Sequence, residues 1–142
     1  MNDHSTRGRW ILGLAAIILV VASLLQWWQT GGNEVTQLSN VGISDGRGFI
    51  IFLAAIATLL LLTLPYAAEH PVAVDHPLVY LSLMLVMIAA FVWATFGLIL
   101  EKGTNLFPFP PQRGIGYWLT ALGLIIFARG VLYLAEAYRR GP

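Results

Sequence analysis

The stretch PLVYLSLMLVMIAAFVWATFGLIL, residues 77–100, decides the fold of this chain. It runs from Pro77 to Leu100 without a single Asp, Glu, Lys or Arg. At a rise of about 1.5 Å per residue, a helix of this length reaches across the hydrocarbon core of a bilayer, which is about 30 Å thick. Buried strands are about four to eight residues long and end in turn signals, so the stretch predicts a helix.

Three further apolar segments have similar lengths: residues 10–28 (WILGLAAIILVVASLLQWW), about 48–66 and about 116–138. The first follows Arg7 and Arg9 but ends in Gln26-Trp27-Trp28 rather than in small residues that a signal peptidase would cleave, so we predict a retained span. The sequence therefore predicts an all-α integral membrane protein. Residues 1–142 form one four-helix transmembrane bundle, with spans at about 10–28, 48–66, 77–100 and 116–138.

The composition agrees with a membrane location. Hydrophobic residues make up 58% of the chain and charged residues 11%, whereas a soluble domain has about 25% charged residues. A chain of 142 residues cannot bury so much apolar surface within itself. The lipid bilayer is therefore the first expected partner, and other membrane subunits are the second. The absence of cysteine excludes disulfides and thiolate metal sites. The net charge of +1, with no basic run, predicts no nucleic-acid partner.

Four spans place both termini on one side of the membrane. That side holds Arg7, Arg9, Arg139 and Arg140, and the other side holds Arg47, Lys102 and Arg113. The positive-inside rule then favours cytoplasmic termini in the inner (plasma) membrane of the cell. The connection at residues 29–47 is polar and rich in glycine, which is typical of a small hairpin or an irregular loop.

The fourth span carries a stripe of small residues. Gly116, Gly123 and Gly130 recur every seven residues, Ala137 continues the series, and Thr120 lies between the glycines. Small residues let membrane helices approach closely, and a seven-residue spacing keeps them on one face. We expect this stripe to contact a neighbouring helix, within the bundle or in another subunit, with Thr120 hydrogen-bonding across the contact.

Arg129 is the only charge well inside an apolar segment, and Glu136 follows it by seven residues. An ionisable residue within a span is a candidate functional residue, because it is costly unless it is paired or hydrated. Two interpretations stay open. In the first, Arg129 has a structural role: it extends its stem toward the headgroups or forms an ion pair. In the second, it has a role in transport or in binding an anionic group.

Aromatic residues gather where the predicted spans meet the outer surface: Trp27, Trp28, Phe49, Phe107, Phe109, Tyr117 and Trp118. They indicate an interfacial aromatic belt, or else a docking surface for a partner or a lipid-like cofactor.

The connection at residues 67–76 contains Glu69-His70-Pro71 and then Asp75-His76-Pro77. The prolines favour turns and a helix start capped by Asp75 or His76. The alternative is a cofactor site at His70 and His76, although the spacing matches no metal motif.

The paired Trp27 and Trp28, the glycines at Gly31, Gly32 and in segment 42–48, and the sequence GIGYW at 114–118 define a layout. In this layout the chain resembles small bacterial inner-membrane proteins with four spans, which implies a location but no activity. It is also similar to claudin-like tetraspans in its aromatic-flanked first outer loop, but it lacks the cysteine pair expected there.

We therefore expect a non-enzymatic accessory or scaffold subunit of a larger respiratory, photosynthetic or transport complex. Continuous apolar spans, short loops and the glycine stripe favour this function, and no catalytic motif appears in the sequence. One alternative is a small homo-oligomeric channel or transporter using Arg129 and Glu136. A weaker alternative is a pigment-binding or haem-binding subunit using His70 or His76.

Overall fold

The computed structural model describes residues 3–30, 38–44, 46–67, 76–102 and 114–140. It contains four long helices: α1 (Asp3–Leu24), α2 (Gly46–Ala67), α3 (Pro77–Lys102) and α4 (Ile115–Arg139). Each is long and apolar enough to cross a membrane. The predicted four-helix transmembrane bundle is confirmed.

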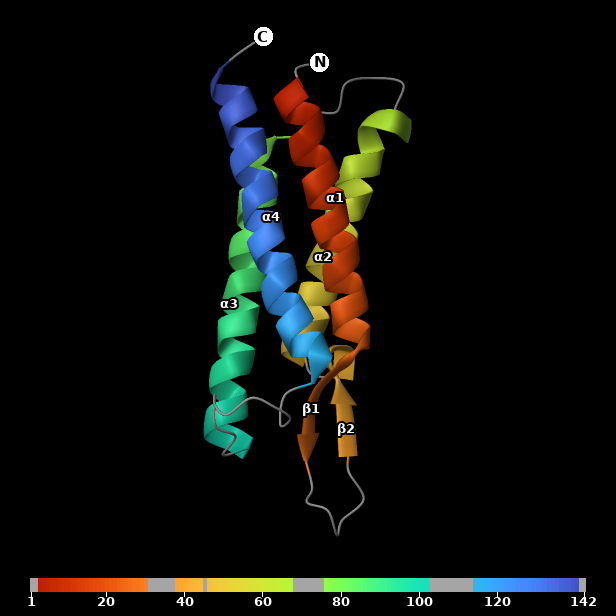
Figure 1. Ribbon diagram of the computed structural model, residues 1–142, viewed down its shortest axis with the longest axis vertical. Helices are drawn as coiled ribbons and strands as arrows, with labels where there is room; N and C mark the ends of the chain where they lie inside the picture. The colour runs from red at the N-terminus through yellow and green to blue at the C-terminus, as the bar shows by residue number, and fades with distance from the viewer. Residues whose placement is uncertain (1–2, 31–37, 45, 68–75, 103–113, 141–142) are drawn as a thin grey trace.

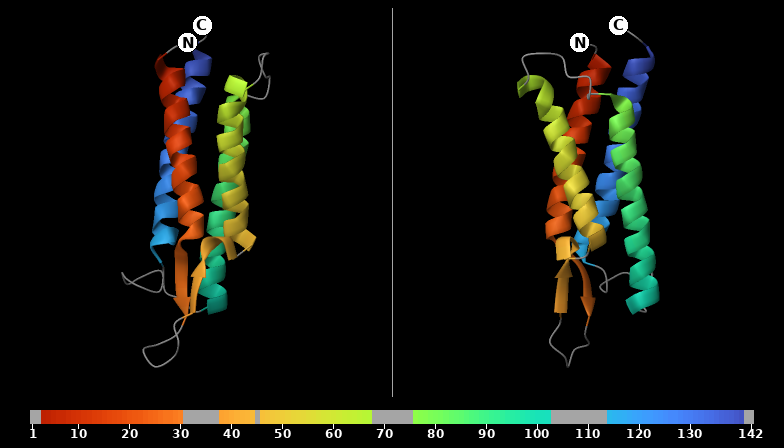
Figure 2. Two further views of the ribbon diagram at one scale, coloured as in Figure 1. Left: turned by 90° about the vertical axis from the view of Figure 1, so that its right-hand side faces the viewer. Right: turned by 180° about the vertical axis from the view of Figure 1, so that it is seen from behind.

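The helices run alternately up and down (Figure 1). Each packs on two neighbours: α1 contacts α2 and α4, and α3 contacts the same two helices from the other side. The most extensive contact joins α1 to α4, and the side view shows these two helices as one pair and α2 with α3 as the other (Figure 2). We call the end where α1 begins and α4 finishes the terminal end, and the opposite end the hairpin end.

A two-stranded hairpin occupies the hairpin end (Figure 1). Strand β1 (Gln26–Thr30) pairs antiparallel with β2 (Leu38–Val41), and a 3-10 turn at Gly42–Ser44 leads toward α2. The prediction that the first helix continues to Trp28 is therefore wrong, because α1 ends at Leu24. The Trp27 indole folds back and donates from Nε1 to the carbonyl of Ala22 at 2.9 Å, near the end of α1, where the same carbonyl also accepts from the amide of Leu25 at 3.3 Å.

The interior of the bundle is largely apolar, and three Ser and Thr side chains are buried in it among the described residues. Each donates to the carbonyl four residues earlier in its own helix: Ser23 to Leu19 at 2.8 Å, Thr58 to Ala54 at 2.9 Å and Thr120 to Gly116 at 2.8 Å. These three hydroxyl groups thus find partners within their own helices, as an environment without water favours.

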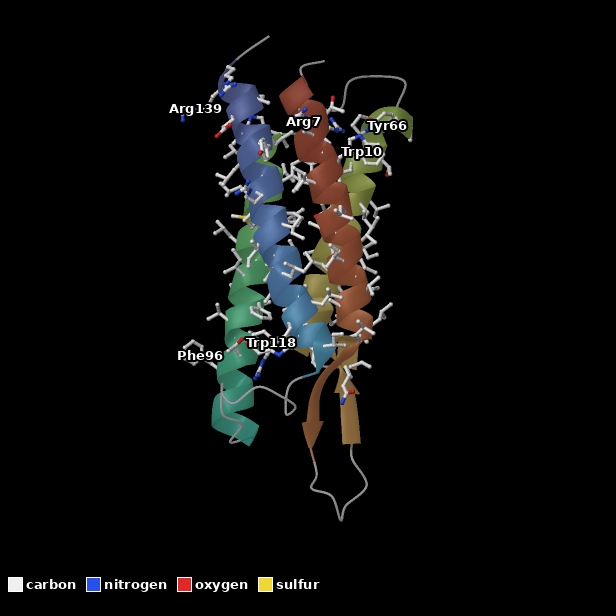
Figure 3. All side chains as sticks on the ribbon, in the orientation of Figure 1. Arg7, Trp10, Tyr66, Phe96, Trp118 and Arg139 are labelled. Carbon is white, nitrogen blue, oxygen red and sulfur yellow. The ribbon has the colours of Figure 1, made fainter. Side chains whose placement is uncertain are left out.

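Exposed aromatic side chains mark both ends of the bundle. Trp10, Tyr66 and Tyr138 are 77%, 79% and 63% exposed at the terminal end, and Phe49, Phe96 and Trp118 are exposed toward the hairpin end. Figure 3 labels Trp10, Tyr66, Phe96 and Trp118. Along α4, Trp118 and Tyr138 are twenty residues apart, or about 30 Å, which matches the hydrocarbon thickness. The two levels are those expected of aromatic belts at the two membrane surfaces.

The predicted outer belt needs correction at two of its members. Trp27 and Tyr117 are buried inside the bundle, so they do not reach the headgroups. Phe49 and Trp118 are exposed as expected. Phe107 and Phe109 lie outside the described residues, as does the side chain of Trp28.

Candidate functional site

The small-residue stripe of α4 faces α1. A Cβ added to Gly123 would lie 2.9 Å from Cγ and Cδ2 of Leu19, and one added to Gly130 would lie 2.8 Å from Cγ of Leu12. At Gly116 the nearest atom would be the carbonyl oxygen of Ala22, at 2.7 Å. The structure thus places the three glycines at a contact within the bundle, and only a hydrogen fits at each.

The α4 stripe also includes Thr120 and Ala137, which are not glycines. Thr120 is buried, but its hydroxyl bonds to Gly116 of its own helix, so the expectation that it bonds across the contact is wrong. The Thr120 hydroxyl has one hydrogen, and it donates this hydrogen to the carbonyl of Gly116 in its own helix, as Thr within a helix often does. Ala137 is half-buried and continues the stripe toward the terminal end.

A second stripe of small residues, on α1, was not predicted from the sequence. Gly8, Ala15 and Ala22 also recur every seven residues, and all three are buried. Gly8 lies against the backbone of α4, since a Cβ there would be 3.1 Å from the amide nitrogen of Leu134 and 3.3 Å from the carbonyl oxygen of Gly130. The spacing of Gly8, Ala15 and Ala22 in the sequence could have predicted this stripe, because it equals the seven-residue spacing of the glycines in α4.

Trp27 is the centre of a second cluster, at the hairpin end. Its ring meets Phe91 of α3 and Tyr117 of α4 edge-on, with centroids 6.3 and 6.2 Å away, and Phe91 stacks on Tyr117 at 4.9 Å. The Tyr117 hydroxyl is 2.8 Å from Oγ1 of Thr95, which joins α4 to α3. These contacts tie β1, α3 and α4 together.

Glycines surround this cluster. A Cβ on Gly42 would collide with the Trp27 indole, and one on Gly116 would lie 2.9 Å from its Cδ1. The amide of Gly114 donates to the Trp27 carbonyl at 2.7 Å. Three glycines of the layout, Gly42, Gly114 and Gly116, therefore contact Trp27, whereas Gly31 and Gly32 lie outside the described residues.

Arg47 makes a contact that the sequence did not indicate. Its guanidinium lies against Gly97 of α3 and over the ring of Trp93, with Cζ 5.0 Å from the centroid. Only the absence of a side chain at Gly97 leaves room for it. Arg47 thus fastens the start of α2 to α3 at the hairpin end.

Arg129 and Glu136 lie on the outward face of α4, opposite the glycine stripe. The exposed residues of this face follow each other at steps of four and three: Trp118, Leu122, Ile125, Arg129, Leu132 and Glu136. Within the part of the chain that the structure describes, neither charged side chain makes a hydrogen bond or an ion pair. Both therefore point toward whatever surrounds the bundle.

The contact between α1 and α4 gives the depth of Arg129. Gly8 faces Gly130 and Leu134, and Trp10 follows Gly8 by two residues, or about 3 Å. Trp10 is an exposed aromatic residue of the terminal end, so Arg129 lies near the level of Trp10 and about 13 Å from Tyr138 along α4. The Arg129 stem is long enough to carry its guanidinium toward the headgroups, which avoids the cost of about 3 kcal/mol for a charge at the helix centre.

A shallow depression on this face is lined by Arg129, Leu132, Tyr133 and Glu136. A second one, lined by Glu136, Arg139 and Arg140, adjoins it. The first depression thus combines a guanidinium, a phenol and a carboxylate with an apolar wall. A guanidinium forms strong hydrogen bonds with anionic groups such as phosphate, and a carboxylate forms them with cationic donors such as ammonium.

The histidine sites have separate outcomes. His76 caps α3: its Nδ1 accepts from the amide of Leu78 at 3.2 Å, and its ring packs edge-on against Tyr138 at 4.7 Å between centroids. The cap predicted at this position is confirmed. His70 lies outside the described residues.

Among the described residues, no group of three His, Cys, Asp or Glu side chains is placed to hold a metal ion. Comparisons of the chain with protein-family models, with curated proteins and with solved structures give no significant match.

Proposed function

We propose that this protein is a non-enzymatic accessory or scaffold subunit of a larger membrane complex, such as a respiratory, photosynthetic or transport assembly, in a bacterial inner membrane. The observation that carries the proposal is the open face of α3. In the apolar window of α3, 22% of the residues are buried, compared with 39% in α1 and 33% in α2 and α4. α3 is thus the helix that the bundle encloses least.

The outward face of α3 has the features of a helix contact. Ser82, Val86, Ala89 and Trp93 follow one another at steps of four, three and four, and all are exposed. Ser82 and Ala89 are small residues seven positions apart, the spacing that brings α1 and α4 together in this same bundle. Small residues at this spacing favour packing against another helix in lipid.

The interior of the bundle supports a packing role over transport. A pore or substrate path needs a polar lining. Here the buried hydroxyls of Ser23, Thr58 and Thr120 already bond to their own helices, and the groups around them are apolar.

The test uses the absence of cysteine from the chain, which makes any single introduced cysteine unique. Ala89→Cys on α3 and Leu122→Cys on the outward face of α4 are expressed in native membranes and treated with a photoactivatable maleimide. We expect a discrete adduct with a different protein from Ala89→Cys, and none from the matched Leu122→Cys control. A monodisperse free monomer in mild detergent, with no adduct at either position, would contradict the proposal.

The proposed orientation puts the terminal end in the cytoplasm. Arg7, Arg9, Arg139 and Arg140 are at this end, whereas Arg47 and Lys102 lie at the hairpin end, and Arg113 lies outside the described residues. Positive charge is enriched on the cytoplasmic side of membrane proteins. A membrane-impermeant maleimide applied to intact cells should label Ser44→Cys and spare Arg140→Cys, and the reverse pattern would invert the orientation.

A further inference from the structure

We infer that the outward face of α4 is a binding site for the headgroup of a phosphatidylethanolamine lipid, with the phosphate at Arg129 and the ammonium at Glu136. The site is the depression lined by Arg129, Leu132, Tyr133 and Glu136. It is on a different face from the proposed partner contact on α3, so either proposal can fail without the other.

The order of the charges along α4 matches the order of the groups in this lipid. Arg129 lies deeper in the membrane, and Glu136 lies seven residues, or about 10 Å, nearer the terminal end. In phosphatidylethanolamine the phosphate is attached to the glycerol, and the ammonium follows it, two carbons farther from the acyl chains. A positive group below and a negative group above are therefore complementary to the headgroup.

The lengths of the side chains allow both contacts at once. Arg129 reaches toward the headgroups through three methylene groups, while Glu136 is short, and both line the same depression. Tyr133 lies between them and offers a hydroxyl donor to the phosphate. Leu122 and Ile125, which are 50% and 65% exposed, form the apolar surface below Arg129 that acyl chains would cover.

The level of the site in the membrane agrees with a headgroup. Trp10 of α1 lies opposite this part of α4, as the contact of Gly8 with Gly130 and Leu134 requires. Trp10 and Tyr66 are exposed aromatic side chains of the terminal end, as is Tyr138, and Figure 3 shows the first two together with Arg7. Interfacial aromatic rings lie at the headgroup level, which is where the phosphate of a lipid is found.

The same charges disfavour other occupants. A parallel second copy of the chain would place Arg129 against Arg129 and Glu136 against Glu136, because symmetric contacts join equal depths. An anionic lipid such as phosphatidylglycerol pairs with Arg129 but gives Glu136 no cation. Phosphatidylcholine has the right charges, but its quaternary ammonium has no N–H donor for the carboxylate.

The test is native mass spectrometry of the full-length protein in a neutral detergent, titrated with phosphatidylethanolamine, phosphatidylglycerol or phosphatidylcholine of identical acyl chains. We expect phosphatidylethanolamine to bind about fivefold to tenfold more tightly than the other two, the effect of one additional charged hydrogen bond. Glu136→Gln should remove this preference, whereas Arg129→Gln should weaken the binding of all three lipids. Arg7→Gln is the matched control, because it removes a positive charge at the same end but outside the depression, and it should leave the preference unchanged.

Three lipid-binding results would overturn the inference. They are equal or tighter binding of phosphatidylglycerol to the wild type, an undiminished preference in Glu136→Gln, and an Arg7→Gln effect equal to that of Arg129→Gln. A protein adduct from Leu132→Cys in native membranes would assign the face to a partner helix instead, and it would also overturn the inference. Because Arg129 and Glu136 are exposed, both variants should unfold at the temperature of the wild type, so a change in lipid binding is separable from misfolding.

Discussion

The side chain of Leu19 lies over Gly123, so that a methyl group on this glycine would come within 2.9 Å of two leucine carbons. Seven residues away on each helix, Leu12 lies over Gly130 in the same manner. The two helices run in opposite directions, and the repeat keeps leucine above glycine at successive levels. This is the packing of side-chain knobs into holes, with glycine as the floor of each hole.

Replacing Gly130 by alanine should destabilise the bundle by about 1–3 kcal/mol, the range found for overpacked sites. The added methyl group meets Cγ of Leu12 at 2.8 Å and its amide nitrogen at 3.1 Å, and the backbone atom cannot move aside easily. The measurement is equilibrium unfolding in mixed detergent micelles. Gly46→Ala is the control, since nothing lies within 4 Å of a Cβ there and alanine is the better helix former.

A second substitution, at Leu12, tests whether the contact with Gly130 causes this loss of stability. Leu12→Ala alone should destabilise the protein, because it empties a fully buried leucine site. Combined with Gly130→Ala, it should cost less than the sum of the two single changes, since the added methyl group then has space. Strict additivity would show that Leu12 and Gly130 do not contact each other.

The sequence was sufficient to predict four spans, because length and the absence of charge are properties of each segment by itself. The span at residues 77–100 could be predicted without knowing which helices pack against it. The end of the first helix was mispredicted because tryptophan is apolar and continues a hydropathy pattern. The structure instead places Trp27 inside the bundle, where its contacts come from residues 42, 91 and 117. Long-range contacts of this kind leave no local signal.

The hydrogen bond between Thr95 and Tyr117 should contribute about 1 kcal/mol to stability. It joins α3 to α4 at 2.8 Å, while Thr95 is also 2.9 Å from the Phe91 carbonyl of its own helix. A double-mutant cycle with Thr95→Val and Tyr117→Phe isolates the contact between helices. A coupling energy near zero would show that the hydroxyl of Thr95 serves only Phe91.

The candidate site was predictable in part. The glycine stripe and the charges at Arg129 and Glu136 were visible in the sequence, but the side of α4 that each occupies relative to its neighbours was not. The helical period places Arg129 close to the face opposite Gly123. Only the packing of α1 against the glycines determines that the charged face points out of the bundle.

Replacing His76 by alanine should destabilise the protein by about 1 kcal/mol, the usual effect of removing a helix cap. The lost interaction is the hydrogen bond from the amide of Leu78 to Nδ1. His76→Asn should recover most of the loss, because asparagine is a preferred capping residue. The purified wild type should show no absorption band in the visible range, and a band that disappears in His76→Ala would instead support the pigment-binding alternative.

Purified protein in liposomes should give only background flux of ions and small solutes, and Arg129→Ala should give the same flux as the wild type. The reason is the position of Arg129: it is exposed on the outside of α4, so it lines no path through the four helices. A homo-oligomeric pore would have to form between copies, with the outward faces of α4 turned toward a common axis. Flux above background that falls in Arg129→Ala, while Arg7→Ala retains it, would establish such a pore and contradict the scaffold function.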